Sequence, residues 1–89
     1  MEAQTRIKDA LKSQDPRIAV RALALALRTE GMKQAPMYRL FSSELERLAG
    51  EDPRYDIIAD TMDQIWSGPW AKQAALFEQE LTEDRLAAE

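Results

Sequence analysis

The chain has 89 residues, a net charge of −4, and neither cysteine nor histidine. Without these two residue types a protein lacks disulfides, thiolate nucleophiles, imidazole bases and nearly all zinc and haem sites. We therefore expect no catalytic residues and no cofactor. A chain of this length buries only roughly 60% of its unfolded surface, which is enough for one core, so residues 1–89 are expected to form a single domain.

Positive and negative charges separate along the sequence. Residues 1–40 carry eight Lys and Arg against four Asp and Glu, whereas residues 41–89 carry four against twelve. Such a separation is satisfied within the fold, between subunits or by a charged partner. Residues 1–17 are charged and contain no apolar run. They indicate neither a signal peptide nor a membrane anchor, and they predict a cytoplasmic protein.

Apolar residues recur at spacings of three and four along the chain, and period-two alternation persists nowhere. This pattern predicts an all-α fold, a small bundle of about five helices. The first helix is expected over residues 3–13. The second begins at Asp15, an N-cap that is followed by Pro16 at the first helical position, and it ends before Gly31.

This second helix is apolar around most of its circumference. Its arginines, Arg17, Arg21 and Arg28, fall on one narrow arc, and nearly all other positions are Ile, Val, Leu or Ala. A helix of this kind needs cover on several sides, so we expect it to be central in the bundle. A flank left uncovered would pair with a second copy in a homodimer. The arginine stripe is either solvated or a contact surface for phosphate or an acidic protein.

The third helix is expected to begin near residues 35–36 and to stop by Gly50. Asp52 and Pro53 then repeat the order of cap and proline that starts the second helix. The fourth helix runs from there to Gly68 and has the most regular apolar face in the chain. A fifth helix is predicted to follow at once. It starts at Pro69 and carries an apolar stripe of Trp70, Ala74, Phe77 and Leu81.

Two kinds of side chain at the fourth helix suggest a partner-binding surface. Asp56, Asp60 and Asp63 share the face opposite the apolar one, and Trp66 and Trp70 flank the corner after it. Tryptophan is enriched among binding hot spots, and aspartates steer a basic partner. The alternatives are two tryptophans that cap the core and a solvated acidic face. A metal is not expected, because the spacing of loop oxygen ligands typical of an EF-hand is absent.

The corner between the second and third helices offers an alternative function. In the stretch EGMKQAPMYRLF, residues 30–41, the glycine matches the turn of a helix-turn-helix. The side chains facing a DNA groove would be Gln34, Tyr38, Arg39 and Ser42. Residues 10–32 also resemble the opening of some helix-turn-helix antitoxins, a resemblance that implies a DNA-binding regulator using residues 31–43.

Other features of the corner favour plain helix packing. Glu30 stands just before the glycine, where the motif usually has an apolar residue, and the short helix that those antitoxins place after GM is missing. Glu44 and Glu46 extend the third helix with charges that repel phosphate. We therefore predict a non-catalytic interaction, regulatory or adaptor module whose partner is another protein, with nucleic acid and membranes not expected as partners.

Overall fold

The computed structural model describes residues 2–89, except for the side chain of Lys72. Five α-helices and one short 3-10 helix make up the fold, and residues 2–89 contain no strand. The elements are α1 (Ala3–Leu11), α2 (Pro16–Thr29), α3 (Gln34–Glu46), α4 (Pro53–Trp66), η1 (Pro69–Ala74) and α5 (Glu83–Ala88). The predicted all-α fold is confirmed. None of the helices in residues 2–89 has the length and apolar character needed to cross a bilayer.

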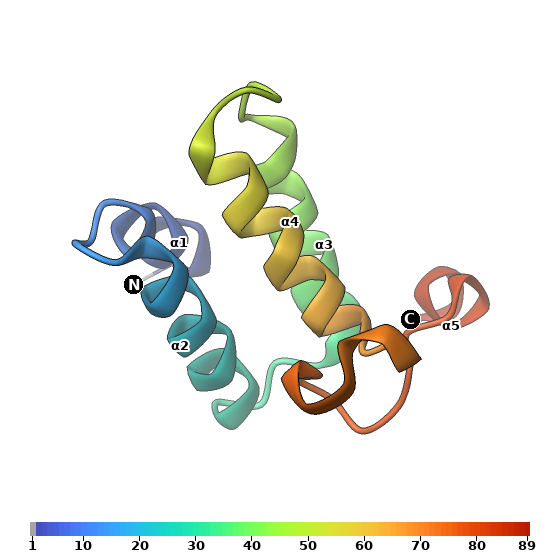
Figure 1. Ribbon diagram of the computed structural model, residues 1–89. Helices are drawn as coiled ribbons and strands as arrows, with labels where there is room; N and C mark the ends of the chain where they lie inside the picture. Colours follow the sequence, from blue (N-terminus) through green and yellow to red (C-terminus); the bar gives the residue numbers. More distant parts are fainter. Residues whose placement is uncertain (1) are drawn as a thin grey trace.

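Figure 1 shows α1 beside α2 and α3 beside α4, with η1 and α5 at the C-terminal end of the chain. α1 packs on α2, α3 packs on α4, and α2 also contacts α3 and α4. The predicted central position of the second helix is therefore confirmed. Its apolar circumference is covered from three directions, and Val20, Ala24 and Leu27 are buried. One large apolar side chain of this helix, Ile18, lies outside the core and is 68% exposed.

The core lies between α1, α2, α3 and α4, and side chains from the segment after η1 also pack into it. The largest of its fully buried side chains are Ile7, Val20, Met37, Phe41, Ile58, Ile65, Leu76 and Leu81. Leu76 and Leu81 lie outside any helix. The segment between η1 and α5 therefore contributes two side chains to the core.

Helices α2 and α4 begin as their sequences predict. The side chain of Asp15 accepts a hydrogen bond from the Ile18 amide at 3.3 Å, and Asp52 accepts one from the Arg54 amide at 2.9 Å. A proline occupies the first turn of each helix. Each aspartate thus satisfies an amide that has no partner within the helix.

The end of α2 is also the predicted one. Gly31 has a φ of 104°, and the Met32 amide donates to the Leu27 carbonyl at 2.9 Å while the Gly31 amide donates to the Arg28 carbonyl at 3.0 Å. This pair of bonds is the Schellman motif, which requires a left-handed residue after the helix. The turn of the EGMKQAPMYRLF stretch is therefore a standard C-terminal cap.

The end of α4 differs from the prediction in one residue. Ser67, and not Gly68, takes the left-handed conformation, with a φ of 58°. Its hydroxyl lies 2.8 Å from the Gln64 carbonyl oxygen and accepts a hydrogen bond from the Phe77 amide at 3.0 Å. These side-chain bonds stabilise a backbone conformation that is otherwise costly for a residue with a Cβ.

The predicted fifth helix is wrong. The chain forms the 3-10 helix η1, then an irregular segment, and finally α5. The irregular segment uses its amides to cap α4, because Leu76 donates to the Gln64 carbonyl at 2.9 Å and Leu81 donates to the Trp66 carbonyl at 2.7 Å. A continuous helix would have used these amides internally, and the last carbonyls of α4 would have lost these donors.

Candidate partner-binding site

The aspartate at the centre of the predicted acidic face is engaged within the fold. Arg17 of α2 forms an ion pair with Asp60 of α4, although both side chains remain more than half exposed. Asp56 and Asp63 are exposed, and neither forms an ion pair with any of the basic side chains that the structure describes, which exclude Lys72. The acidic face therefore offers Asp56 and Asp63 to a partner more readily than Asp60.

The rest of the arginine stripe also faces the protein. Arg21 donates to the Gln64 side chain and, at 3.0 Å, to the Ala74 carbonyl of η1. Arg28 donates to the Leu76 carbonyl in the irregular segment. The stripe is thus an internal contact surface that ties α2 to α4, η1 and the chain beyond. Part of the charge separation seen in the sequence is satisfied within the fold.

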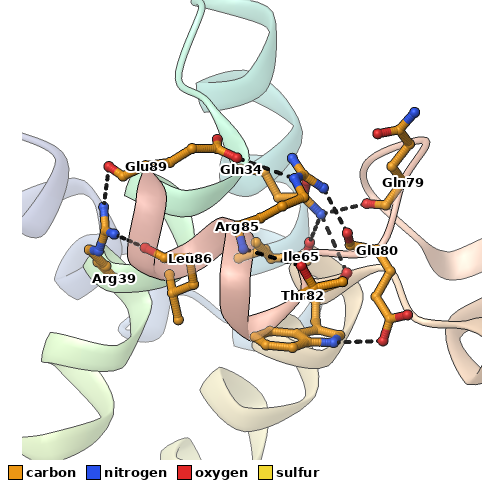
Figure 2. A network of polar contacts seen from close by, with 10 residues as sticks. Gln34, Arg39, Ile65, Gln79, Glu80, Thr82, Arg85, Leu86 and Glu89 are labelled. Atoms are coloured by element: carbon orange, nitrogen blue, oxygen red, sulfur yellow. Dashed lines mark hydrogen bonds and ion pairs between the residues drawn. The ribbon is translucent and has the colours of Figure 1, made fainter.

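Gln34 is buried instead of facing a groove. It is 5% exposed, and its Nε2 donates to the carbonyls of Gln79 at 2.8 Å, Ile65 at 2.9 Å and Trp66 at 3.3 Å. Figure 2 shows its carboxamide among these groups. The physical reason is that the start of α3 meets the end of α4, where carbonyls lack donors within the helix. A helix-turn-helix requires this side chain on the surface, so its exposure was mispredicted.

Tyr38 and Trp66 pack against each other across α3 and α4. Their ring centroids are 5.2 Å apart and their planes are inclined by 60°. Both side chains are half-buried, and burial first, then the charge of Asp63, raise the pKa of the Tyr38 phenol above its usual value. The Trp66 indole N–H donates to Glu80 at 3.0 Å. The Trp66 ring therefore covers the core, as one of the two predictions for it expected, and its N–H makes a polar contact at the edge of that core.

Trp70 is the exposed aromatic side chain of this corner. It is 58% exposed, and its six-membered ring rests on the backbone of Gly68. A Cβ on residue 68 would lie 2.3 Å from the ring, so only glycine permits this packing. One face of the indole is therefore supported by the backbone while much of the side chain stays in water.

Arg39 and Ser42, the other two residues predicted to face DNA, differ in their surroundings. Arg39 donates through Nη1 to the Glu89 carbonyl at 3.0 Å and through Nη2 to the Leu86 carbonyl, so it binds the C-terminal end of α5 (Figure 2). Ser42 is half-buried on α3. Three of the four residues thus make contacts within the protein, Gln34 and Arg39 by hydrogen bonds and Tyr38 by ring packing.

A cavity of about 630 Å³ lies between the end of α2 and the irregular segment. Its polar lining includes Arg28, Gln34 and Arg85. These three side chains already donate to backbone carbonyls of the irregular segment, Arg85 to Glu80 at 2.7 Å. Their donors therefore hold the chain in place, and we assign the cavity no ligand. In the described part of the chain, no cluster of three acidic side chains is placed to hold a metal ion.

No protein-family model, curated protein or solved structure matches this chain. The functional assignment therefore depends on the geometry of these surfaces alone.

Proposed function

We propose that the chain is a non-catalytic module that binds another protein through its aromatic corner, defined as Tyr38, Trp66 and Trp70. The observation that carries the proposal is the 58% exposure of Trp70, whose ring packs against Gly68. A large exposed aromatic side chain is the kind of anchor found at binding hot spots. Trp66 and Tyr38 supply two further aromatic rings, which pack against each other across α3 and α4.

The partner proposed for this surface is a basic segment of a protein. Residues 41–89 carry twelve acidic side chains against four basic ones, and Asp63 and Glu80 flank the Tyr38–Trp66 pair. Lysine and arginine side chains are attracted both to carboxylates and to the faces of indole rings. A partner that places such a cation beside an apolar residue would match both the carboxylates and the aromatic rings of this surface.

DNA binding by residues 31–43 was the alternative, and no contact in the structure favours it. Gln34 and Arg39 donate to backbone carbonyls, and Tyr38 packs on Trp66. Groove contacts would require these side chains to leave their present partners. We therefore keep protein binding as the single proposed function.

The experiment is affinity capture from the native host with mass spectrometry. Wild type, Trp70→Ala and, as a control, Gln14→Ala are compared, because Gln14 is an exposed side chain in the turn between α1 and α2, outside the aromatic corner. The proposal expects proteins that are captured by wild type and Gln14→Ala but lost with Trp70→Ala. The free energy of unfolding is measured for each variant, because loss of capture in proportion to lost stability would contradict a binding role for Trp70.

A further inference from the structure

A second polar cavity, of about 270 Å³, lies where α1, the end of α3 and the start of α4 meet. Its volume is close to the lower limit of small-molecule sites in proteins. Four basic side chains line it: Lys8, Lys12, Arg47 and Arg54. Leu11 and Leu48 supply apolar wall. We call this cavity the basic cavity, and it shares no residue with the aromatic corner.

One acidic side chain lines the same cavity and has no hydrogen bond. Glu44 of α3 is 4% exposed, and its Oε1 is buried without a hydrogen-bond partner in the described part of the chain. The nearest cation is Arg47, whose Nη1 lies 3.6 Å from that oxygen, beyond hydrogen-bonding distance. A buried acceptor with no donor is costly, and natural proteins tolerate few of them. The feature therefore needs an explanation other than core packing.

The cations of the basic cavity differ in how far they are already engaged. Arg54 binds Asp52, with Nη2 2.6 Å from Oδ2. Lys8 lies in the last turn of α1 and Lys12 is the C-cap four residues later; both are exposed, and neither has an ion pair within residues 2–89. The Arg47 side chain is 53% exposed, so its guanidinium can turn toward a ligand.

We propose that the basic cavity binds a small phosphate ester that carries a hydrogen-bond donor, a sugar phosphate or a nucleoside monophosphate. The phosphate lies among Lys8, Lys12 and Arg47, and a hydroxyl or amino group of the ligand donates to Glu44. Arginine and lysine are the usual phosphate-binding side chains, and a carboxylate accepts from hydroxyl and amino donors. An anion without a donor satisfies the cations but leaves Glu44 facing another negative charge.

Binding is measured by calorimetry with three probes: ribose phosphate, guanosine monophosphate and methyl phosphate, which has no donor when its phosphate is fully ionised. The proposal expects ribose phosphate or guanosine monophosphate to bind at least about tenfold more tightly than methyl phosphate, as one hydrogen bond to a charged group predicts. Tight binding of both identifies a sugar phosphate as sufficient. Tight binding of guanosine monophosphate alone assigns the donor to the base.

Glu44→Gln separates recognition by the carboxylate from simple attraction between charges. It removes a negative charge, so methyl phosphate should bind it more tightly than wild type, whereas the preference for the donor-bearing probes should fall about tenfold. Equal affinity of wild type for all three probes, no binding of any, or a uniform gain in Glu44→Gln would each overturn the proposal.

A second set of variants keeps the proposal testable if Glu44→Gln does not fold. The double variant Lys8→Gln, Lys12→Gln changes exposed side chains and should weaken the donor-bearing probes at least about tenfold, since charge-assisted bonds to phosphate are lost. The matched control is Lys33→Gln, because Lys33 is exposed and does not line this cavity. Unchanged binding in the double variant, or equal loss in the control, would overturn the proposal.

Discussion

The ring of Trp70 packs on Gly68 so closely that a Cβ at residue 68 would lie 2.3 Å from the ring carbons Cη2 and Cζ3. Gly68 does not have a positive φ, so its backbone does not require glycine. The requirement comes from the indole instead. The absence of a side chain at Gly68 therefore allows the Trp70 ring to take the orientation that it has in this structure.

Gly68→Ala should displace the Trp70 ring and leave the core intact. Because Trp70 is mostly exposed, the ring can move at a cost in unfolding free energy of about 1 kcal/mol or less, as for surface substitutions. Partner capture should fall to the level of Trp70→Ala. Capture at the wild-type level, with the Trp70 ring shown by NMR to have moved, would mean that its orientation is irrelevant to binding.

Gln34→Leu should destabilise the fold by about 1–3 kcal/mol, because it removes the donor for carbonyls at the junction of α3, α4 and the irregular segment. Urea unfolding measures the loss. The control is Gln73→Leu, which changes an exposed glutamine of η1. Equal stability of the two variants would show that the Gln34 contacts contribute little.

The starts of α2 and α4 were predictable from the sequence because their causes are local. Asp15 and Asp52 accept hydrogen bonds from amides only two or three residues away, and the cap at Gly31 is formed by hydrogen bonds to carbonyls of the preceding helical turn. The predicted fifth helix failed because its amides bond to α4, at carbonyls such as Gln64 and Trp66. Periodicity in a sequence carries no information about which distant carbonyls lack donors.

The candidate site was predicted only in part for the same reason. Trp70 is exposed at a helix corner as one interpretation of the sequence allowed, whereas Asp60 is paired with an arginine 43 residues earlier. Glu80 was missed because its role is defined by the Trp66 indole. Glu44 entered the sequence argument only as a charge that repels DNA, and nothing in its sequence context indicated a buried carboxylate.

The phenol of Tyr38 should ionise above its usual pH, since burial and the charge of Asp63 both raise its pKa. The neutral phenol therefore stabilises the folded state fully below the pKa of an unfolded tyrosine, and this contribution is lost as the pH rises through the folded pKa. Tyr55→Phe leaves Tyr38 as the single tyrosine for an absorbance titration. Adding Asp63→Asn should lower the Tyr38 pKa part of the way, because burial is the larger cause. No change on adding Asp63→Asn would contradict this account of the site.

Self-association through α2 remains a prediction. Ile18 is 68% exposed and Ala22, one turn later, is also exposed, so a second copy can bury both. Sedimentation at high protein concentration should detect species heavier than the 10.1 kDa chain. Ile18→Asp should shift them to the monomer. A wild-type protein that stays monomeric throughout would remove the prediction.

The most direct test of the aromatic corner uses the fluorescence of Trp70 itself. Trp66→Phe keeps a ring against Tyr38 and leaves Trp70 as the single tryptophan, since the chain has two. A purified protein captured by the wild type is titrated into this variant. The account predicts a blue shift of Trp70 emission that saturates with binding, because the indole leaves water on contact with the partner. Saturable binding measured by calorimetry with unchanged Trp70 emission would show that the partner binds elsewhere and would contradict the proposed function.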